Sequence, residues 1–286
     1  MLKDEEWVYT ISPKQRRLNF NFKEIWHYRD LLFLFVKRDI ITLYKQTILG
    51  PLWYFIQPLF TSVIFTLIFN NLGQIKTGGV PPLLFNMAGI TAWNYFKECL
   101  NGTSTTFTKN QGIFGKVYFP RVIMPISITI SNLLKFAIQL LIFAGFYIYF
   151  YLNGSLVGIS YSIVLLPIYV LMMALLGLGI GMLLSSLTTK YRDLTVLVSF
   201  GVQLLMYVSA VPYPLAEAKN KFPSYIYSIV NYNPLAQIIE GFRYMLLGKG
   251  IFSPFTLIYI LVISVSMFLM GLVIFNKTEK SFIDTV

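Results

Sequence analysis

The sequence predicts an all-α polytopic membrane protein. It should have six transmembrane helices, an N-terminal amphipathic interfacial helix, and a helical hairpin on the outer side between spans five and six. Hydrophobic residues make up 56% of the 286 residues and charged residues only 12%, about half the share of charged residues in soluble domains. Long apolar runs recur along the chain, and Lys and Arg gather in alternate connections between them.

Six apolar segments are long enough to cross about 30 Å of hydrocarbon, which takes about 20 helical residues. They are 52–72, 83–105, 124–150, 161–187, 194–212 and 253–275. The connections and termini on one side hold 16 Lys and Arg residues, and those on the other side hold five. This bias places both termini in the cytoplasm, and it accounts for the formal charge of +11 without a nucleic-acid partner. Residues 1–21 and 276–286 are then cytoplasmic, and 51–275 form the transmembrane domain.

Residues 22–50 are predicted to form an amphipathic helix that lies at the membrane interface. Asn21-x-x-Glu24 resembles a capping box. Polar residues then recur along one stripe opposite a broad apolar face, which is typical of interfacial helices. We expect the charged residues Arg38, Asp39 and Lys45 to be solvated or to dock a partner.

The Gly50-Pro51 step predicts a fixed elbow between this helix and span one. Proline disfavours helical conformation in the preceding residue and suits the first turn of a new helix. The interfacial helix should therefore end near Leu49 and span one should begin at Pro51. Trp53 would then lie at the level of the lipid headgroups.

Residues 213–252 are predicted to form a hairpin of two short amphipathic helices on the outer side. Asn233 is a favourable N-cap, Pro234 a favourable first helical residue, and Glu240 can pair with Arg243 three residues later. The hairpin either dips into the membrane or lies on its outer surface. Irregular backbone survives at membrane depth only when it is packed in protein or lines a wet cavity, so these residues alone favour the surface.

Charged residues also interrupt spans two and three. A charge at the bilayer centre costs about 2.5–3.5 kcal/mol on insertion scales, so it usually faces a partner or water. Counting the rise along each span, we expect Glu98 and Lys135 to come close enough to pair. Asn132 and Gln139 share the helix face of Lys135, which suggests a polar interior path. Lys97 is expected to snorkel towards the interface.

Motifs for nucleotide binding and hydrolytic catalysis are not found in the sequence. It contains no G-x-x-x-x-G-K-[ST] loop, no H-E-x-x-H and no G-x-S-x-G, which rules out the phosphate-binding loop, the zinc protease helix and the nucleophile elbow. We therefore expect no catalytic, cofactor-binding or metal-binding residue in this chain, and a source of energy in another polypeptide.

Five stretches together carry a family resemblance. They are RDIITLYKQTILGPLWYFIQP (38–58), GITAWNYF (89–96), NQGIFGKVYFPRVIMP (110–125), KYRDL (190–194) and NPLAQIIEGFRYMLL (233–247). In this order and with this span pattern, the chain from about residue 20 onward resembles the transmembrane subunit of ABC-2 type polysaccharide exporters. That group includes O-antigen, capsule and teichoic acid permeases, and the KVYFPR stretch is most similar to the O-antigen type.

The resemblance implies a homodimeric permease in the inner membrane of a bacterium, with a sugar channel along its axis. Two separate cytoplasmic ABC ATPase subunits would bind ATP and Mg. Loop 106–123 would carry the coupling helix, and hairpin 213–252 would form the outer gate, which now favours a re-entrant hairpin that dips into the membrane. The coupling residues would be Asn110, Ile113, Lys116, Tyr118, Phe119, Pro120 and Arg121. The family's channel is lined by aromatic residues, for which Trp53, Tyr54 and Tyr207 are the candidates here.

The leading hypothesis for function is therefore ATP-driven export of a lipid-linked, O-antigen-like polysaccharide. The same transmembrane body could instead export a drug or a small lipid. A membrane-embedded glycosyltransferase is the third hypothesis, and it would need an acidic catalytic residue on the outer side. Glu217 and Glu240 are the only acids there, and Glu240 is expected to pair with Arg243.

Overall fold

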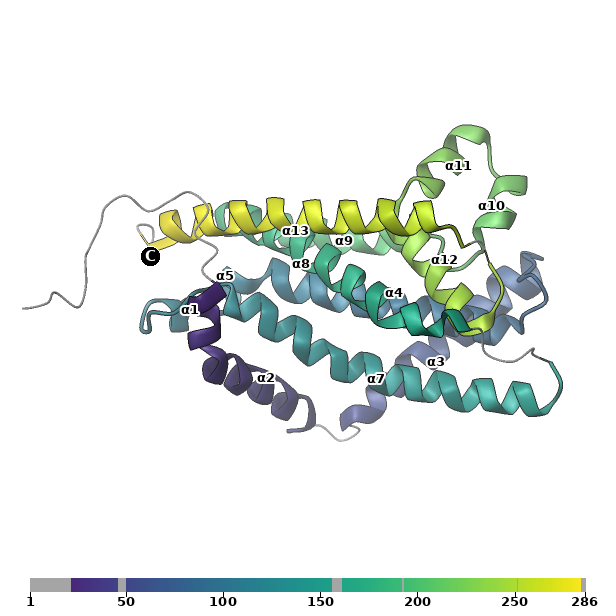
Figure 1. The fold of residues 1–286 in the computed structure, drawn as a ribbon, viewed down its shortest axis with the longest axis horizontal. Coiled ribbons are helices and arrows are strands. Elements are labelled where there is room, and N and C mark those ends of the chain that lie inside the picture. Colours follow the sequence, from purple (N-terminus) through teal and green to yellow (C-terminus); the bar gives the residue numbers. More distant parts are fainter. Residues whose placement is uncertain (1–21, 46–49, 156–160, 192, 251, 284–286) are drawn as a thin grey trace, which may run out of the picture.

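The computed structural model describes residues 22–45, 50–155, 161–191, 193–250 and 252–283, and every regular element within them is helical (Figure 1). The elements are α1 (Phe22–His27), α2 (Arg29–Tyr44), η1 (Gly50–Leu52), α3 (Trp53–Phe65), the π-helix η2 (Thr66–Leu72), α4 (Pro82–Ser104), α5 (Thr106–Lys109), α6 (Gln111–Phe114), α7 (Ile123–Leu152), η3 (Tyr161–Leu165), α8 (Leu166–Lys190), α9 (Leu194–Val208), α10 (Leu215–Lys221), α11 (Ser224–Asn231), α12 (Pro234–Leu247) and α13 (Pro254–Ile283).

Four helices in the described residues are long and apolar enough to cross a membrane: Trp53–Leu72, Ile123–Leu152, Tyr161–Lys190 and Pro254–Glu279. The other two predicted spans also contain helices. However, α4 carries Lys97 and Glu98 among its 23 residues, and α9 has 15 residues, about 22 Å at 1.5 Å per residue. The architecture is therefore multi-pass and helical, while the number of six crossings stays a prediction.

Glycines let α8 lie unusually close to α4 on one side and α13 on the other. A Cβ added at Gly177 would stand 2.8 Å from Cys99 Cβ, and one at Gly181 would stand 2.6 Å from Thr103 Cβ, both on α4. A Cβ at Gly179 would stand 2.6 Å from the main chain of Met267 on α13. Small residues allow this close backbone approach, which is the main source of helix association in lipid. The core of the bundle thus centres on α8.

A second apolar cluster joins α2, the short helices α5 and α6, and the C-terminal part of α13. Phe107 of α5 stacks on Phe275 of α13 with ring centroids 4.5 Å apart, and Phe119 lies 5.7 Å from Phe35 of α2. All four rings are buried. Figure 1 shows α1, α5 and the C-terminal end of α13 together at one end of the molecule, with α10, α11 and α12 at the other.

The predicted single helix over 22–50 is wrong in its extent. The chain is interrupted at Tyr28 between α1 and α2, and α2 ends at Tyr44 because Lys45 adopts an extended conformation with ψ 131°. Asn21, the expected capping residue, and Leu49, the expected helix end, lie outside the described residues. The break itself is confirmed: Gly50 has φ +48°, a left-handed conformation that favours glycine, and Pro51 follows in the 3-10 turn η1.

The predicted fifth span, 194–212, is also too long. Helix α9 ends at Val208, and Ala210 has φ +53°. Pro212 and Pro214 follow, and proline both lacks an N–H donor and disfavours helical conformation in the residue before it. The chain therefore leaves the helix four residues before the predicted boundary.

Gly179→Val tests the close contact between α8 and α13. The added side chain would meet the main chain of Met267 and Phe268, so we expect the melting temperature of the purified protein to fall by about 5 °C or more. Gly145→Val on α7 is the matched control, because nothing lies within 4 Å of a Cβ there. Equal melting temperatures for the two variants would show that the close contact between α8 and α13 does not stabilise the protein.

Candidate functional site

The predicted coupling loop consists of two short helices and a turn. Asn110 lies between α5 and α6, and its Nδ2 donates to Thr106 O at 2.9 Å. Ile113 is half-buried and Phe119 is buried, and both pack into the aromatic cluster with Phe35. Lys116 and Tyr118 are exposed, with Tyr118 80% accessible. The loop thus presents a narrow tip, Lys116–Tyr118, on a buried aromatic base.

Arg121 does not belong to that exposed tip. Its side chain is 8% exposed, its Nη1 donates to Glu279 O at 2.9 Å, and its Nε lies 3.8 Å from Glu279 Oε1. The guanidinium also lies over the Phe114 ring, 5.1 Å from its centroid. Pro120 accepts a hydrogen bond from Ile123 N at the start of α7. Arg121 therefore fastens the loop to the C-terminal part of α13.

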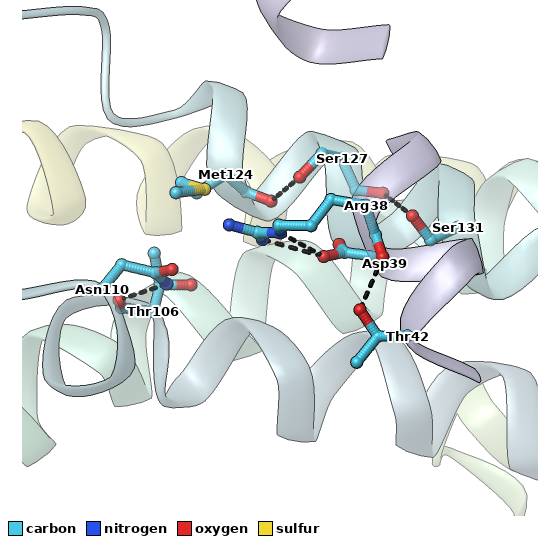
Figure 2. A network of polar contacts seen from close by, with 8 residues as sticks. All are labelled: Arg38, Asp39, Thr42, Thr106, Asn110, Met124, Ser127 and Ser131. Carbon is cyan, nitrogen blue, oxygen red and sulfur yellow. Dashed lines mark hydrogen bonds and ion pairs between the residues drawn. The ribbon is translucent and has the colours of Figure 1, made fainter. Parts of the chain in front are cut away.

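The charged residues of α2 pair with one another beside α7. Arg38 Nη2 donates to Asp39 Oδ1 at 2.8 Å, and the guanidinium lies 4.9 Å from the centroid of the Phe35 ring. Figure 2 shows this pair next to Met124 and Ser127 of α7, with the Thr42 hydroxyl donating to Arg38 O. Lys45 is exposed at the end of the helix. Arg38 and Asp39 thus neutralise each other at an exposed position on α2, the helix that packs on α7.

The four polar residues predicted for spans two and three meet where α4 packs on α7. Lys135 Nζ donates to Glu98 Oε2 at 3.0 Å, which confirms the predicted pair. Asn132 and Gln139 are buried in the same seam, and Gln139 accepts a bond from Asn94 at 3.5 Å. Asn94 in turn accepts from Lys97 Nζ at 3.3 Å. We call these six residues the polar seam: Asn94, Lys97, Glu98, Asn132, Lys135 and Gln139.

The depth of the polar seam follows from its contact with span one. Lys135 Nζ lies 5.3 Å from the centroid of the Tyr54 ring, and Tyr54 is the second residue of α3. The pair is thus level with the beginning of span one, and the first three turns of the 30-residue helix α7 extend beyond it. A small cavity between α3, α4 and α7 opens beside the seam, lined partly by Tyr54, Thr91 and Gln139. It has room for about one water molecule.

The hairpin predicted over 213–252 contains three short helices, α10, α11 and α12, rather than two, and it is built around a buried arginine. Arg243 is 1% exposed. Its Nη1 donates to Ala210 O at 2.9 Å and to Tyr213 O at 3.4 Å, its Nη2 donates to Val211 O, and its Nε donates to Phe85 O at 3.3 Å. The guanidinium stacks on the Phe85 ring at 3.8 Å. One side chain of α12 therefore holds the irregular connection after α9 and the start of α4.

Asn233, Pro234 and Glu240 occupy the positions predicted for them. Asn233 Oδ1 accepts from Leu235 N at 3.0 Å, and Pro234 is the first residue of α12. Glu240 forms the expected ion pair with Arg243, at 3.8 Å, but this is too long for a hydrogen bond. The pKa of the Glu240 carboxyl is raised above its usual value by burial. This effect outweighs the lowering by Arg243 and by a hydrogen bond from Leu215 N.

The three candidate aromatic residues have different environments. Trp53 and Tyr207 are about half exposed, at 53% and 45%, whereas Tyr54 is half-buried against Lys135. Trp53 and Tyr54 begin α3, and Tyr207 lies near the end of α9. The described part of α9 buries only Val202, so most of this helix faces away from the rest of the chain.

Sequence reasoning predicted the pair of Arg243 with Glu240, but it missed the main-chain acceptors of Arg243 and the partner of Arg121. Arg243 binds main-chain carbonyls, which have no signature in the sequence. The Pro212-Tyr213-Pro214 run did signal that helical hydrogen bonds must end nearby. Glu279, the partner of Arg121, is an acid within the positive tail 276–286, and only the folding of α13 back to the loop brings the two together.

Four helices long and apolar enough to cross a membrane, with many large apolar side chains exposed, define an integral membrane protein. The family model for the ABC-2 type transporter matches residues 30–247, and the chain belongs to this family.

Curated relatives cover almost the full length of the chain. It is 26% identical over 255 residues to the O-antigen export system permease protein RfbA of Klebsiella pneumoniae, which covers 89% of this chain and 94% of that protein. It is 22% identical over 270 residues to the protein of the same name from Myxococcus xanthus, covering 92% and 98%. It is 22% identical over 262 residues to the polysialic acid transport protein KpsM of Escherichia coli, covering 90% and 95%. The resemblance seen in the sequence motifs is confirmed.

Arg121→Met tests the attachment of the loop to α13. Methionine keeps much of the buried volume but cannot donate to Glu279 O, so we expect the exposed tip to loosen. Trypsin added to the Lys116 side should then cut after Lys116 about ten times faster, as measured by fragment mass. Lys109→Met removes an exposed cation nearby and should leave that rate unchanged; the same rate in both variants would contradict the attachment.

Proposed function

We propose that this chain is the permease subunit of an ATP-driven exporter that moves a lipid-linked polysaccharide across the cytoplasmic membrane. The observation that carries the proposal is the agreement of the relatives. Proteins named for O-antigen export and for polysialic acid transport both align over about nine tenths of this chain. Two different polysaccharides share this subunit design, so we assign a long glycan, O-antigen-like in type, as the cargo.

A homodimer with the path between the two copies is part of this proposal. Supporting it, α3 and α9 contribute little to the core of the single chain: Val202 is the buried residue of α9, and Ser62 and Phe65 are those of α3. The cavity beside the polar seam has room for about one water molecule, far too small for a sugar chain. Two copies facing each other through α3 and α9 would enclose a wider path. Trp53 and Tyr207 would offer flat apolar rings to the CH faces of sugars.

Energy would come from two cytoplasmic ATPase subunits, which bind ATP and Mg, docked at the end that holds α1, α5 and the end of α13. The exposed tip Lys116–Tyr118 supports this assignment, because a solvated cation and an exposed aromatic ring suit a docking contact. The aromatic base beneath the tip supplies a rigid support. Movement of the docked partner would pass into α2, α7 and α13, which all meet at this base.

The polar seam is proposed to border the cytoplasmic entrance of the path. Lys135 and Glu98 lie level with the start of span one, and Glu98 remains 40% exposed in the single chain. Both can exchange their mutual contact for hydroxyl groups of a sugar. The hairpin α10–α12 at the opposite end is proposed to close the outer exit.

Deletion of the gene tests the assignment of the cargo. We expect loss of one surface polysaccharide, together with accumulation of the lipid-linked polymer inside the cell, because synthesis would continue without export. Gel analysis of surface glycan and extraction of lipid-linked polymer measure the two quantities. An unchanged surface would contradict the proposal, and altered efflux of a drug or small lipid in its place would assign the transporter to that cargo.

Lys135→Leu tests the role of the polar seam in transport. We expect export to fall about ten-fold while the amount of protein in the membrane stays within about two-fold, because the lost charge leaves Glu98 without its partner at the entrance. The exchange variant Glu98→Lys with Lys135→Glu distinguishes a role of the pair in the transport path from a role in stabilising the fold. If it restores export fully, the pair is structural, and if Lys135→Leu exports normally, Lys135 lies outside the path.

A further inference from the structure

We infer that Arg243 and Asn233 are positioning residues of the outer gate: they anchor the α10–α12 hairpin to the outer ends of α4 and α9, so that the hairpin moves only together with these two helices. The inference rests on the proposed function, in which this hairpin closes the exit. We call Arg243 and Asn233 the gate anchor. It adds to the predicted pair of Glu240 and Arg243, which does not by itself hold the hairpin to another helix.

The segment held by the gate anchor is irregular and buried. Between α9 and α10 the chain runs through residues 209–214 without helical structure, yet Ser209, Ala210 and Val211 are fully buried. The last carbonyls of a helix lack intrahelical partners. Burial prevents water from reaching them here, so protein donors have to satisfy them.

Arg243 supplies donors that no other side chain could supply from the same place. Its guanidinium reaches Ala210 O, Val211 O and Tyr213 O in this segment, and it reaches Phe85 O on α4. Five N–H groups in a rigid planar fork make this possible, whereas lysine has three donors on one atom. The contact with Phe85 makes the arginine a direct link between α12 and the start of α4.

Asn233 completes the anchor from the first residue before α12. Its Nδ2 donates to Val208 O at 3.2 Å and to Ser209 Oγ at 3.1 Å, while its Oδ1 caps α12 through Leu235 N. One amide thus joins the end of α9 to the beginning of α12. Together the two side chains bind the main chain on both sides of the turn at Ala210.

Space around the anchor is limited by a glycine of α4. A Cβ added at Gly89 would collide with Arg243 Nη2 and would stand 3.1 Å from Val211 O. Only the absence of a side chain at this position lets the guanidinium lie between α4 and residues 210–213. Gly89→Ala therefore displaces the anchor without removing any of its donors.

The test measures how readily the anchored segment opens to the outside. Cys99 is the single cysteine and is buried, so a Cys99→Ala, Val211→Cys background carries one probe at a fully buried position. Val211 contributes only its main-chain oxygen to the anchor, so the probe leaves every bond of Arg243 and Asn233 in place. The complex with its ATPase partner is labelled in reconstituted vesicles with a membrane-impermeant maleimide. We expect Gly89→Ala to raise the labelling rate at least ten-fold over Gly145→Ala, the control glycine on α7 with nothing within 4 Å of a Cβ.

Asn233→Asp is the second variant, in case Gly89→Ala does not accumulate. Aspartate keeps the acceptor that caps α12 but loses both donors, so we expect labelling about three-fold faster than in the control. A purely structural role predicts less protein in the membrane with an unchanged labelling rate per assembled complex, and that outcome overturns the inference. Because labelling needs no export, faster labelling supports the anchor even if the gene deletion rejects polysaccharide as the cargo.

Discussion

The need to satisfy main-chain carbonyls away from water is the constraint on which the rest of this structure depends. A helix that ends inside a membrane protein exposes acceptors, and irregular backbone at that depth is stable only when protein donors reach it. Here α9 ends at Val208, and α12 supplies the donors through Asn233 and Arg243. The place of α12 against α4 follows, because Phe85 O and the space over Gly89 are part of the same arrangement.

The helices at the two ends of the molecule are held together by different kinds of contact. At the end that holds loop 106–123, buried phenylalanine rings gather α2, α5, α6 and α13, and Arg121 adds a charged contact to α13. At the hairpin end, hydrogen bonds to main chain dominate. Ring contacts tolerate sliding and tilting, whereas a planar guanidinium with four acceptors permits little change of geometry. The end that holds loop 106–123 is thus suited to small movements, and the hairpin end to holding a defined position.

Hydropathy and charge predicted the location of every long helix, because apolar length and loop charge are written directly in the sequence. The Glu98–Lys135 pair was also predictable, since both charges sit inside spans and the rise per residue gives their depths. The prediction missed three features: the interruption at Tyr28, the early end of α9 and the π-helix Thr66–Leu72. The Pro212-Tyr213-Pro214 run is a local signal for the end of α9, whereas the π-helix is held by another helix, because Asn86 of α4 donates to Thr66 and Asn70 within it. The acceptors of Arg243 were hidden for a similar reason, because any residue can provide a carbonyl.

The contact between Arg121 and Glu279 also imposes an order on biosynthesis. The two residues are 158 positions apart, and a chain is made from its N-terminus onward. Loop 106–123 therefore emerges from the ribosome long before α13 exists, and its exposed tip receives its final support only when the last helix has folded back. A truncated subunit would carry every residue of the tip and still lack its shape. The exposed tip Lys116–Tyr118 therefore reaches its final structure only after α13, the last helix, has folded.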